Sequence, residues 1–157
     1  MREILFKAKR INWRDLPEEQ HWVTGYYWTN GLENHFIRVT FENDEFTIKD
    51  YEIDLNTLCQ YTNMDDEFDD KIFENDYVKF EDVGEEGYEY KEGFDFINTA
   101  KVVFHNGKWV LDNFGELNSA VYEEMDDNSE LFTTLIHSKI IGNGFDNPEM
   151  SGESIWV

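Results

Sequence analysis

The sequence predicts a mainly β protein made of strands and hairpins, with one or two short helices. Aromatic residues make up 17% of its 157 residues, and such side chains suit the surface of a pleated sheet. Apolar and polar residues alternate along several short segments, and turn residues separate these segments at short intervals. One of the turns is the dipeptide Asn106-Gly107, which provides both positive-φ positions of a type I′ hairpin turn.

The first third of the chain is predicted to form four strands. A loop with Pro17 follows the first strand, and Thr29–Gly31 forms a turn after the second. Glu42–Glu45 lies between the third and fourth strands as the turn of a hairpin. The predicted strands are residues 3–11, 22–28, 35–41 and 45–53.

The middle of the chain is predicted to continue with strands after one short helix. Asp54 is the expected N-cap of that helix, because its side chain can accept the free N–H groups of the first turn. A strand begins within residues 70–80, after a dense acidic turn. Residues 101–111 form the hairpin around Asn106-Gly107.

No linker divides the sequence, so a single domain over residues 1–157 is expected. Residues 81–100 are rich in glycine and acidic residues and are predicted to be an acidic loop or insertion. Residues 117–125 fit a helix, whereas residues 131–141 are rich in β-forming residues.

The net charge of −22 limits the partners that this protein can have. Such a surface repels nucleic acids and anionic membranes, so neither is expected to bind directly. Cys59 is the single cysteine, so no intramolecular disulfide can form, and a reducing cytoplasm is the expected compartment.

The charge is unevenly distributed along the chain. Residues 1–14 carry a net charge of +4, which leaves −26 for the remainder. Lys7 and Lys9 should share one face of the first strand. We expect this basic strand to pair with acidic neighbours in its own fold, because opposite charges across strands stabilise sheets. A separate basic docking site is the alternative.

The acidic turn has one alternative interpretation, a calcium-binding loop. Counting from Asp65 places acidic and apolar residues at the spacing of an EF-hand. However, Asp70 stands where the loop needs glycine, and the flanks predict a strand where an EF-hand has a second helix. A solvated turn is therefore the prediction, with no metal site at the candidate ligands Asp65, Glu67, Asp69 and Asp76.

No residue pattern in the sequence predicts catalysis or a cofactor. The four histidines show no metal-ligand spacing with one another or with Cys59, which is expected to be a packed side chain. No nucleophile elbow, phosphate loop or dinucleotide fingerprint is present. The histidines are His21, His35, His105 and His137. We therefore expect no catalytic, cofactor-binding or metal-binding residue in the sequence.

The segment QYTNMDDEFDDKIFENDYVKF resembles the YopX family of phage and prophage proteins. Residues 1–11, 22–28 and 139–150 also resemble family segments, in the same order. Three family glycines are replaced here by Asn63, Asp70 and Asn75, the residue types that best tolerate positive φ. A fourth family glycine is replaced by Cys59, which this argument does not explain. The predicted structural turn motif is Gln60, Tyr61, Asn63, Asp70, Asn75 and Asp76.

The resemblance implies an SH3-like barrel core with additional strands and hairpins, and no enzymatic activity. It leads us to expect a phage or prophage accessory protein in the cytoplasm of a bacterial host. The module would bind a protein partner or assemble with itself as a homo-oligomer. The alternative is an acidic mimic of nucleic acid that inhibits a host nucleic-acid-binding protein.

Overall fold

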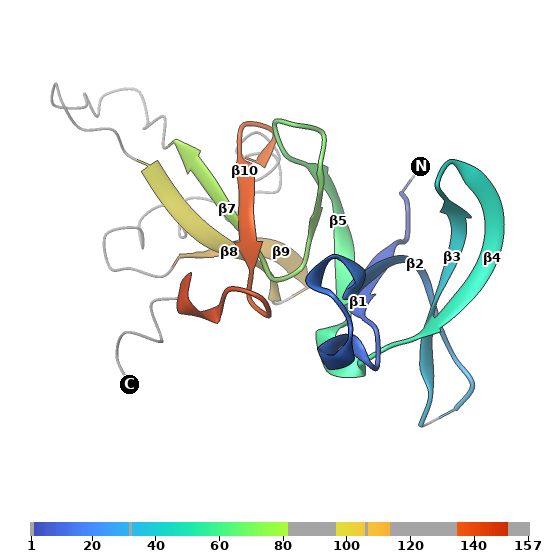
Figure 1. Cartoon of the computed structure of the whole chain (residues 1–157). Coiled ribbons are helices and arrows are strands. Elements are labelled where there is room, and N and C mark those ends of the chain that lie inside the picture. Colours follow the sequence, from blue (N-terminus) through green and yellow to red (C-terminus); the bar gives the residue numbers. More distant parts are fainter. Residues whose placement is uncertain (1, 32, 82–96, 106, 114–134, 151–157) are drawn as a thin grey trace, which may run out of the picture. The chain divides into compact units, whose positions relative to one another are not determined.

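A computed structural model describes residues 2–31, 33–81, 97–105, 107–113 and 135–150, and it consists of antiparallel strands (Figure 1). The chain divides into two compact units, Met1–Asn63 and Met64–Val157. The helices whose bounds both lie within the described residues are 3₁₀ turns of three residues each. The prediction of a mainly β protein with short helices is therefore confirmed.

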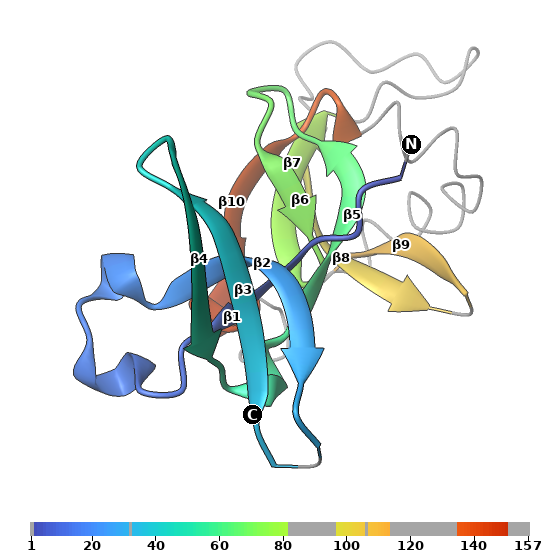
Figure 2. The ribbon, with the colours of Figure 1, turned by 90° about the vertical axis from the view of Figure 1, so that its right-hand side faces the viewer.

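The N-terminal unit contains β1 to β4 and the first residues of β5, which continues past the boundary of the unit. The strands follow the order β4-β3-β2-β1-β5, and Figure 2 shows β3 and β4 as a long curved hairpin. Two 3₁₀ turns, η1 (Trp13–Asp15) and η2 (Glu18–Gln20), occupy the predicted loop after the first strand. The strands are β1 (Phe6–Lys9), β2 (Trp22–Thr29), β3 (His35–Glu42), β4 (Glu45–Glu52) and β5 (Cys59–Asp65).

Strand β2 changes partner at Gly25. Its first half pairs with β1 as far as Phe6↔Gly25, and its second half pairs with β3 from Tyr26↔Arg38. A Cβ atom at Gly25 would overlap the carbonyl oxygen of Arg38, so only glycine allows β3 to approach this closely. The sequence signal was a lone glycine inside a strand pattern.

The core of the N-terminal unit lies on one face of this sheet. Ala8, Ile37 and Ile53 are buried at its centre. The turn between β3 and β4 places Asn43 and Asp44 at φ of 54° and 62°, so the predicted hairpin is confirmed. Partly buried residues pack around the centre, namely Phe6, Val23, Tyr27, Val39 and Leu58.

Of the short helix expected over residues 54–62, only the 3₁₀ turn η3 (Leu55–Thr57) forms, because the chain from Cys59 onward belongs to β5. The side chain of Asp54 accepts a hydrogen bond from the N–H of Asn56 at 3.2 Å, as expected for the cap.

The C-terminal unit contains a four-stranded sheet in the order β10-β7-β8-β9 and the short strand β6, which lies next to β5. The strands are β6 (Lys71–Phe73), β7 (Asp76–Glu81), β8 (Ile97–His105), β9 (Lys108–Asn113) and β10 (Lys139–Asn143). Its buried core is Ile72, Val78, Phe80, Ala100, Val102, Leu111 and Leu135.

The predicted hairpin in this unit is confirmed by the pairing of β8 with β9 up to His105↔Lys108. Gly107 has φ of 81°, and Asn106 lies outside the described residues. Of the predicted acidic loop, residues 82–96 lie outside the described part, whereas its last residues belong to β8. The helix expected over residues 117–125 also lies outside it.

The described residues form two antiparallel sheets, and their strands do not close into a barrel. None of their helices is long and apolar enough to span a membrane.

Candidate interaction surface

The turn motif contains the positive-φ residues that its amide side chains predicted. Asn63 has φ of 65° and Asn75 has φ of 71°. In the acidic turn between them, the positive-φ residue is Asp69, at 62°, and Asp70 is not. Two of the three residues that replace family glycines therefore have positive φ, and in the acidic turn this conformation falls on Asp69.

Asp66 is a structural residue that the sequence did not single out. It is 4% exposed, and its Oδ1 accepts the N–H groups of Phe68 and Asp70, both at 2.9 Å. Its Oδ2 accepts the N–H of Ile140 at 3.2 Å. The available signal was an aspartate two residues before a turn, the usual arrangement of an Asx turn. Asp66 therefore joins this turn to β10.

Asn75 and Asp76 form the second turn, between β6 and β7. Asp76 is 2% exposed, and its carboxylate accepts the N–H of Phe73 at 2.8 Å. The N–H of Asn75 donates to the carbonyl of Val102 at 2.7 Å, and its carbonyl accepts from Gly144 at 2.9 Å. The turn is thus fixed to β8 and to the segment after β10.

Gln60, Tyr61 and Asn63 hold the beginning of the chain against β5. Gln60 lies opposite Phe6, and the N–H of Tyr61 donates to the carbonyl of Leu5 at 2.8 Å. The Oδ1 of Asn63 accepts the N–H of Glu3 at 2.9 Å. These residues are structural.

Side chains of the segment after β10 stabilise its turn by hydrogen bonds to its own backbone. Oδ1 of Asn143 accepts the N–H groups of Phe145 and Asp146, both at 2.9 Å. Oδ1 of Asn147 accepts the N–H of Asn143 at 3.2 Å. A Cβ at Gly142 would lie 2.6 Å from that same Asn147 oxygen, which explains the glycine.

The described residues offer no arrangement of ligands for a metal ion. No group of three or more His, Cys, Asp or Glu side chains comes together in this part of the chain. Asp76, one of the four candidate calcium ligands, is already engaged with the backbone of Phe73. Cys59 is 1% exposed and its thiol donates to the carbonyl of Thr57 at 3.3 Å, so it is a packed side chain.

The described histidines serve separate local contacts. His21 Nε2 lies 2.9 Å from the carbonyl of Leu16, and His35 Nδ1 lies 2.7 Å from the hydroxyl of Tyr27. His105 and His137 are exposed.

Lys7 and Lys9 share a face of β1, and the residues directly opposite them in the neighbouring strands are uncharged. The ammonium of Lys9, a residue only 3% exposed, lies 4.0 Å from the ring centroid of Trp13. The ammonium of Lys7 lies 4.8 Å from that of Trp22. Both charges therefore make cation–π contacts with aromatic rings. The directly opposite residues are Thr24, Cys59 and Trp22.

The outer face of β2–β4 carries an ordered cluster of polar and aromatic groups. The guanidinium of Arg38 donates to both carboxylate oxygens of Asp50, at 2.9 and 3.0 Å. The indole N–H of Trp28 donates to Asp50 at 3.1 Å, and its ring stacks on Phe36 with centroids 4.4 Å apart. The hydrogen bond from Arg38, reinforced by that from Trp28, lowers the pKa of Asp50 below its usual value.

The end of the β3–β4 hairpin carries the most exposed aromatic residues of the described chain. Phe41 and Phe46 face each other across the two strands, with an edge-to-face distance of 5.8 Å between centroids. Their exposed fractions are 64% and 70%, and that of the neighbouring Ile48 is 63%. We call these three residues the arm surface. The two phenylalanines flank the turn in the sequence, but their exposure could not be read from it.

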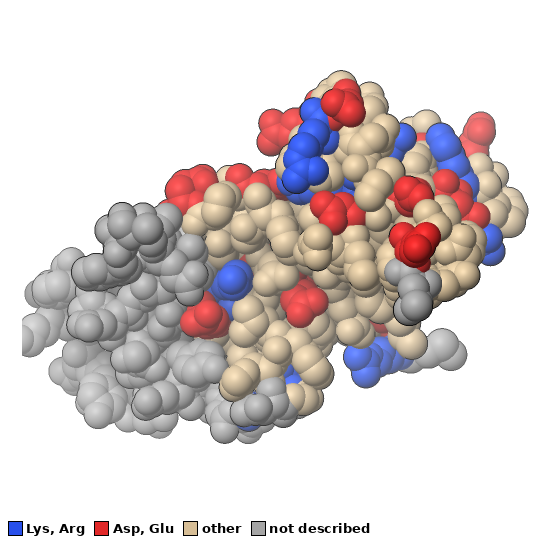
Figure 3. All heavy atoms as spheres, turned by 90° about the horizontal axis from the view of Figure 1, so that it is seen from below, with Lys and Arg blue, Asp and Glu red and all other residues tan. Residues whose placement is uncertain are grey.

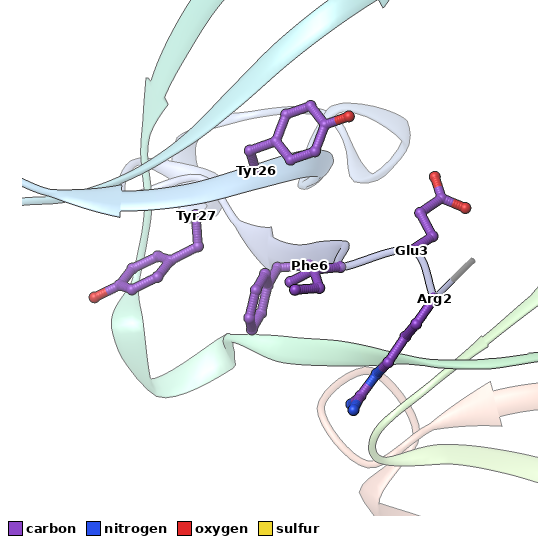
Figure 4. A pocket seen from close by; sticks show the side chains of 6 residues that line it. Arg2, Glu3, Phe6, Tyr26 and Tyr27 are labelled. Carbon is purple, nitrogen blue, oxygen red and sulfur yellow. The ribbon is translucent and has the colours of Figure 1, made fainter.

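A second feature is an open hollow of about 460 Å³ beside β2 (Figure 4). Phe6 and Tyr27 pack on each other beside it, with ring centroids 5.8 Å apart. Ile4 and Tyr26 contribute side chains that are 61% and 51% exposed. The full lining is Arg2, Glu3, Ile4, Phe6, Tyr26 and Tyr27.

The two units differ in charge. Residues 1–63 contain seven Lys and Arg against eleven Asp and Glu, a net charge of −4, whereas residues 64–157 carry −18. Residues 82–96 and 114–134, outside the described part, hold twelve of the acidic residues. On the face shown in Figure 3, the described acidic and basic side chains are interspersed.

Comparisons with known proteins agree with the resemblance noted in the sequence. The family model described as YopX protein matches residues 15–150. No curated protein matches the chain. The fold is similar to that of protein EF1440 from Enterococcus faecalis, with 15% identity, a TM-score of 0.50, and coverage of 96% of this chain and 99% of that one. The family match covers most of the sequence, and the chain therefore belongs to the YopX protein family.

Proposed function

We propose that this protein is a non-enzymatic phage or prophage accessory protein whose N-terminal unit binds another protein. Eleven large apolar side chains are exposed in the described residues, and eight of them belong to residues 1–63. This unit also carries little net charge, so an apolar partner surface can approach it with less repulsion than it would meet at the acidic remainder.

The arm surface is the observation that carries the proposal. Phe41, Phe46 and Ile48 are each more than 60% exposed at the end of one hairpin. Grouped exposed apolar residues mark interaction sites, and aromatic anchors supply much of the energy of protein interfaces. Among the described residues of this unit, the ring contact given for Phe41 and Phe46 is the one between them.

The alternative function is mimicry of nucleic acid by an acidic surface. The net charge of −18 on residues 64–157 favours it, because duplex DNA presents about one charge per 1.7 Å of axis. Asp66 and Asp76 do not contribute to such a surface, since both are buried in turns.

Capture of partners from host lysate at low and high salt tests the proposal. The wild type is compared with the double variant Phe41→Ser/Phe46→Ser. The matched control is Phe68→Ser/Phe104→Ser, because these rings are 60% and 53% exposed in the other unit.

We expect a partner that is retained at high salt and lost only with the arm variant, because apolar burial depends little on screening. A basic nucleic-acid-binding partner that is released at high salt would support mimicry. Equal capture by all three proteins at high salt would contradict a role for the arm surface.

A further inference from the structure

We propose that the hollow beside β2 binds an extended apolar segment of a partner protein, which adds as a strand to the open edge of β2. The proposal rests on the proposed function and specifies a binding mode at a second surface of the same unit.

Strand β2 has an unoccupied edge at Tyr27. The carbonyl of His21 accepts from Arg10 of the β1 side at 2.8 Å, so the odd-numbered residues of β2 direct their backbone groups toward β1. At the other end of β2, Asn30 donates to Asn34 at 3.4 Å, so the even-numbered residues face β3. Pairing with β1 ends at Gly25, and no described hydrogen bond takes up the backbone groups of Tyr27.

The opposite wall of the hollow is the segment that precedes β1. Leu5 accepts from Tyr61 on the β5 side, so the alternate residue Ile4 directs its N–H and carbonyl toward β2. No described hydrogen bond engages these groups of Ile4 either. The side chains of Ile4 and Tyr26, both lining residues of the hollow, are exposed.

This combination fits a peptide strand better than a small apolar molecule. A strand supplies N–H and carbonyl groups to an open edge and places alternate side chains on one face, here among the apolar lining residues. Arg2 and Glu3, one charge of each sign, lie at the hollow. Two copies of this chain repel each other, because each carries −22, so the charge favours a segment of a different, non-acidic protein.

The test selects a displayed library of short random peptides on the full chain and then uses the most enriched sequence as a synthetic peptide. Its affinity is measured for the wild type, for Ile4→Glu and for Tyr26→Glu. Ile11→Glu is the control, since Ile11 is 53% exposed in the same unit but does not line the hollow. A peptide with N-methylated alternate amides tests the backbone contribution.

We expect enriched peptides with alternating apolar residues, and losses of affinity of about tenfold or more for Ile4→Glu, Tyr26→Glu and the methylated peptide. Ile11→Glu should bind like the wild type, and the peptide should slow hydrogen exchange at the amide of Tyr27. Absence of enrichment, or equal binding by all variants, would overturn the proposal. Concentration-dependent protection of Tyr27 without peptide would assign the edge to a second copy and also overturn it.

These outcomes are independent of the partner test for the arm surface. A partner lost with Phe41→Ser/Phe46→Ser, but no peptide at the hollow, would leave the proposed function intact and remove this binding mode.

Discussion

Substitutions of Asn75 test how strongly the turn between β6 and β7 depends on a positive φ angle. Its φ of 71° is strained for any residue with a Cβ, and most strained for a β-branched one. Relaxation of φ would disturb the hydrogen bonds from Asn75 to Val102 and from Gly144 to Asn75. Each of these bonds contributes about 1 kcal/mol, so the strain cannot be relieved without a comparable loss.

We therefore expect Asn75→Val to lower the free energy of unfolding by about 2 kcal/mol. This corresponds to a decrease in Tm of about 4–8 °C for a chain of this size. Asn75→Gly should be neutral or slightly stabilising, because glycine adopts positive φ freely. Urea denaturation and thermal melts of the two variants measure the difference.

Asp70→Val is the matched control, because Asp70 lies in a similar turn and is not at positive φ. It should change stability by less than about 0.5 kcal/mol. The reasoning would be refuted if Asn75→Val and Asn75→Gly were equally stable, or if Asp70→Val cost as much as Asn75→Val.

The remaining predictions concern charge. Asp66→Asn should lower the free energy of unfolding by about 2 kcal/mol, measured by urea denaturation. The amide NH₂ would face a backbone N–H, such as that of Ile140, which now donates to the carboxylate. Unchanged stability would contradict this role of Asp66. Calorimetry with calcium should show no saturable micromolar binding at residues 65–76, and a one-to-one isotherm there would count against the turn interpretation. The pKa of Asp50 is lower in the folded state than its ordinary value of 3.8. Pairing with Arg38 therefore stabilises the fold at pH values above 3.8, and this stabilisation is lost as the pH falls through the pKa of the folded state. The stability difference between wild type and Asp50→Asn should therefore be small, constant near neutral pH and absent at strongly acidic pH, and a difference that grows on acidification would refute it. Gel shifts with generic DNA and RNA at about 0.1 M salt should show no complex, and a robust shift would overturn the charge argument.

The sequence alone determined the features that depend on neighbouring residues. The alternation of side chains predicted β1–β4 and β7–β9, and Asn106-Gly107 predicted the hairpin between β8 and β9. Asn63 and Asn75 stand where the similar YopX family segment has glycine, and both have positive φ. Turn type and strand period are local properties, so a short stretch of sequence is sufficient to specify them.

Contacts between distant segments were decided only by the tertiary structure. Asp66 accepts a hydrogen bond from the N–H of Ile140, which is 74 residues away in the sequence. In the same turn, Asp69 and not Asp70 has positive φ. The ammonium of Lys9 lies over the ring of Trp13, because the loop after β1 brings that residue to it. The exposure of Phe41 and Phe46, 64% and 70%, is likewise a property of the folded chain. Burial depends on which segments meet in space, and neither periodicity nor turn chemistry contains that information.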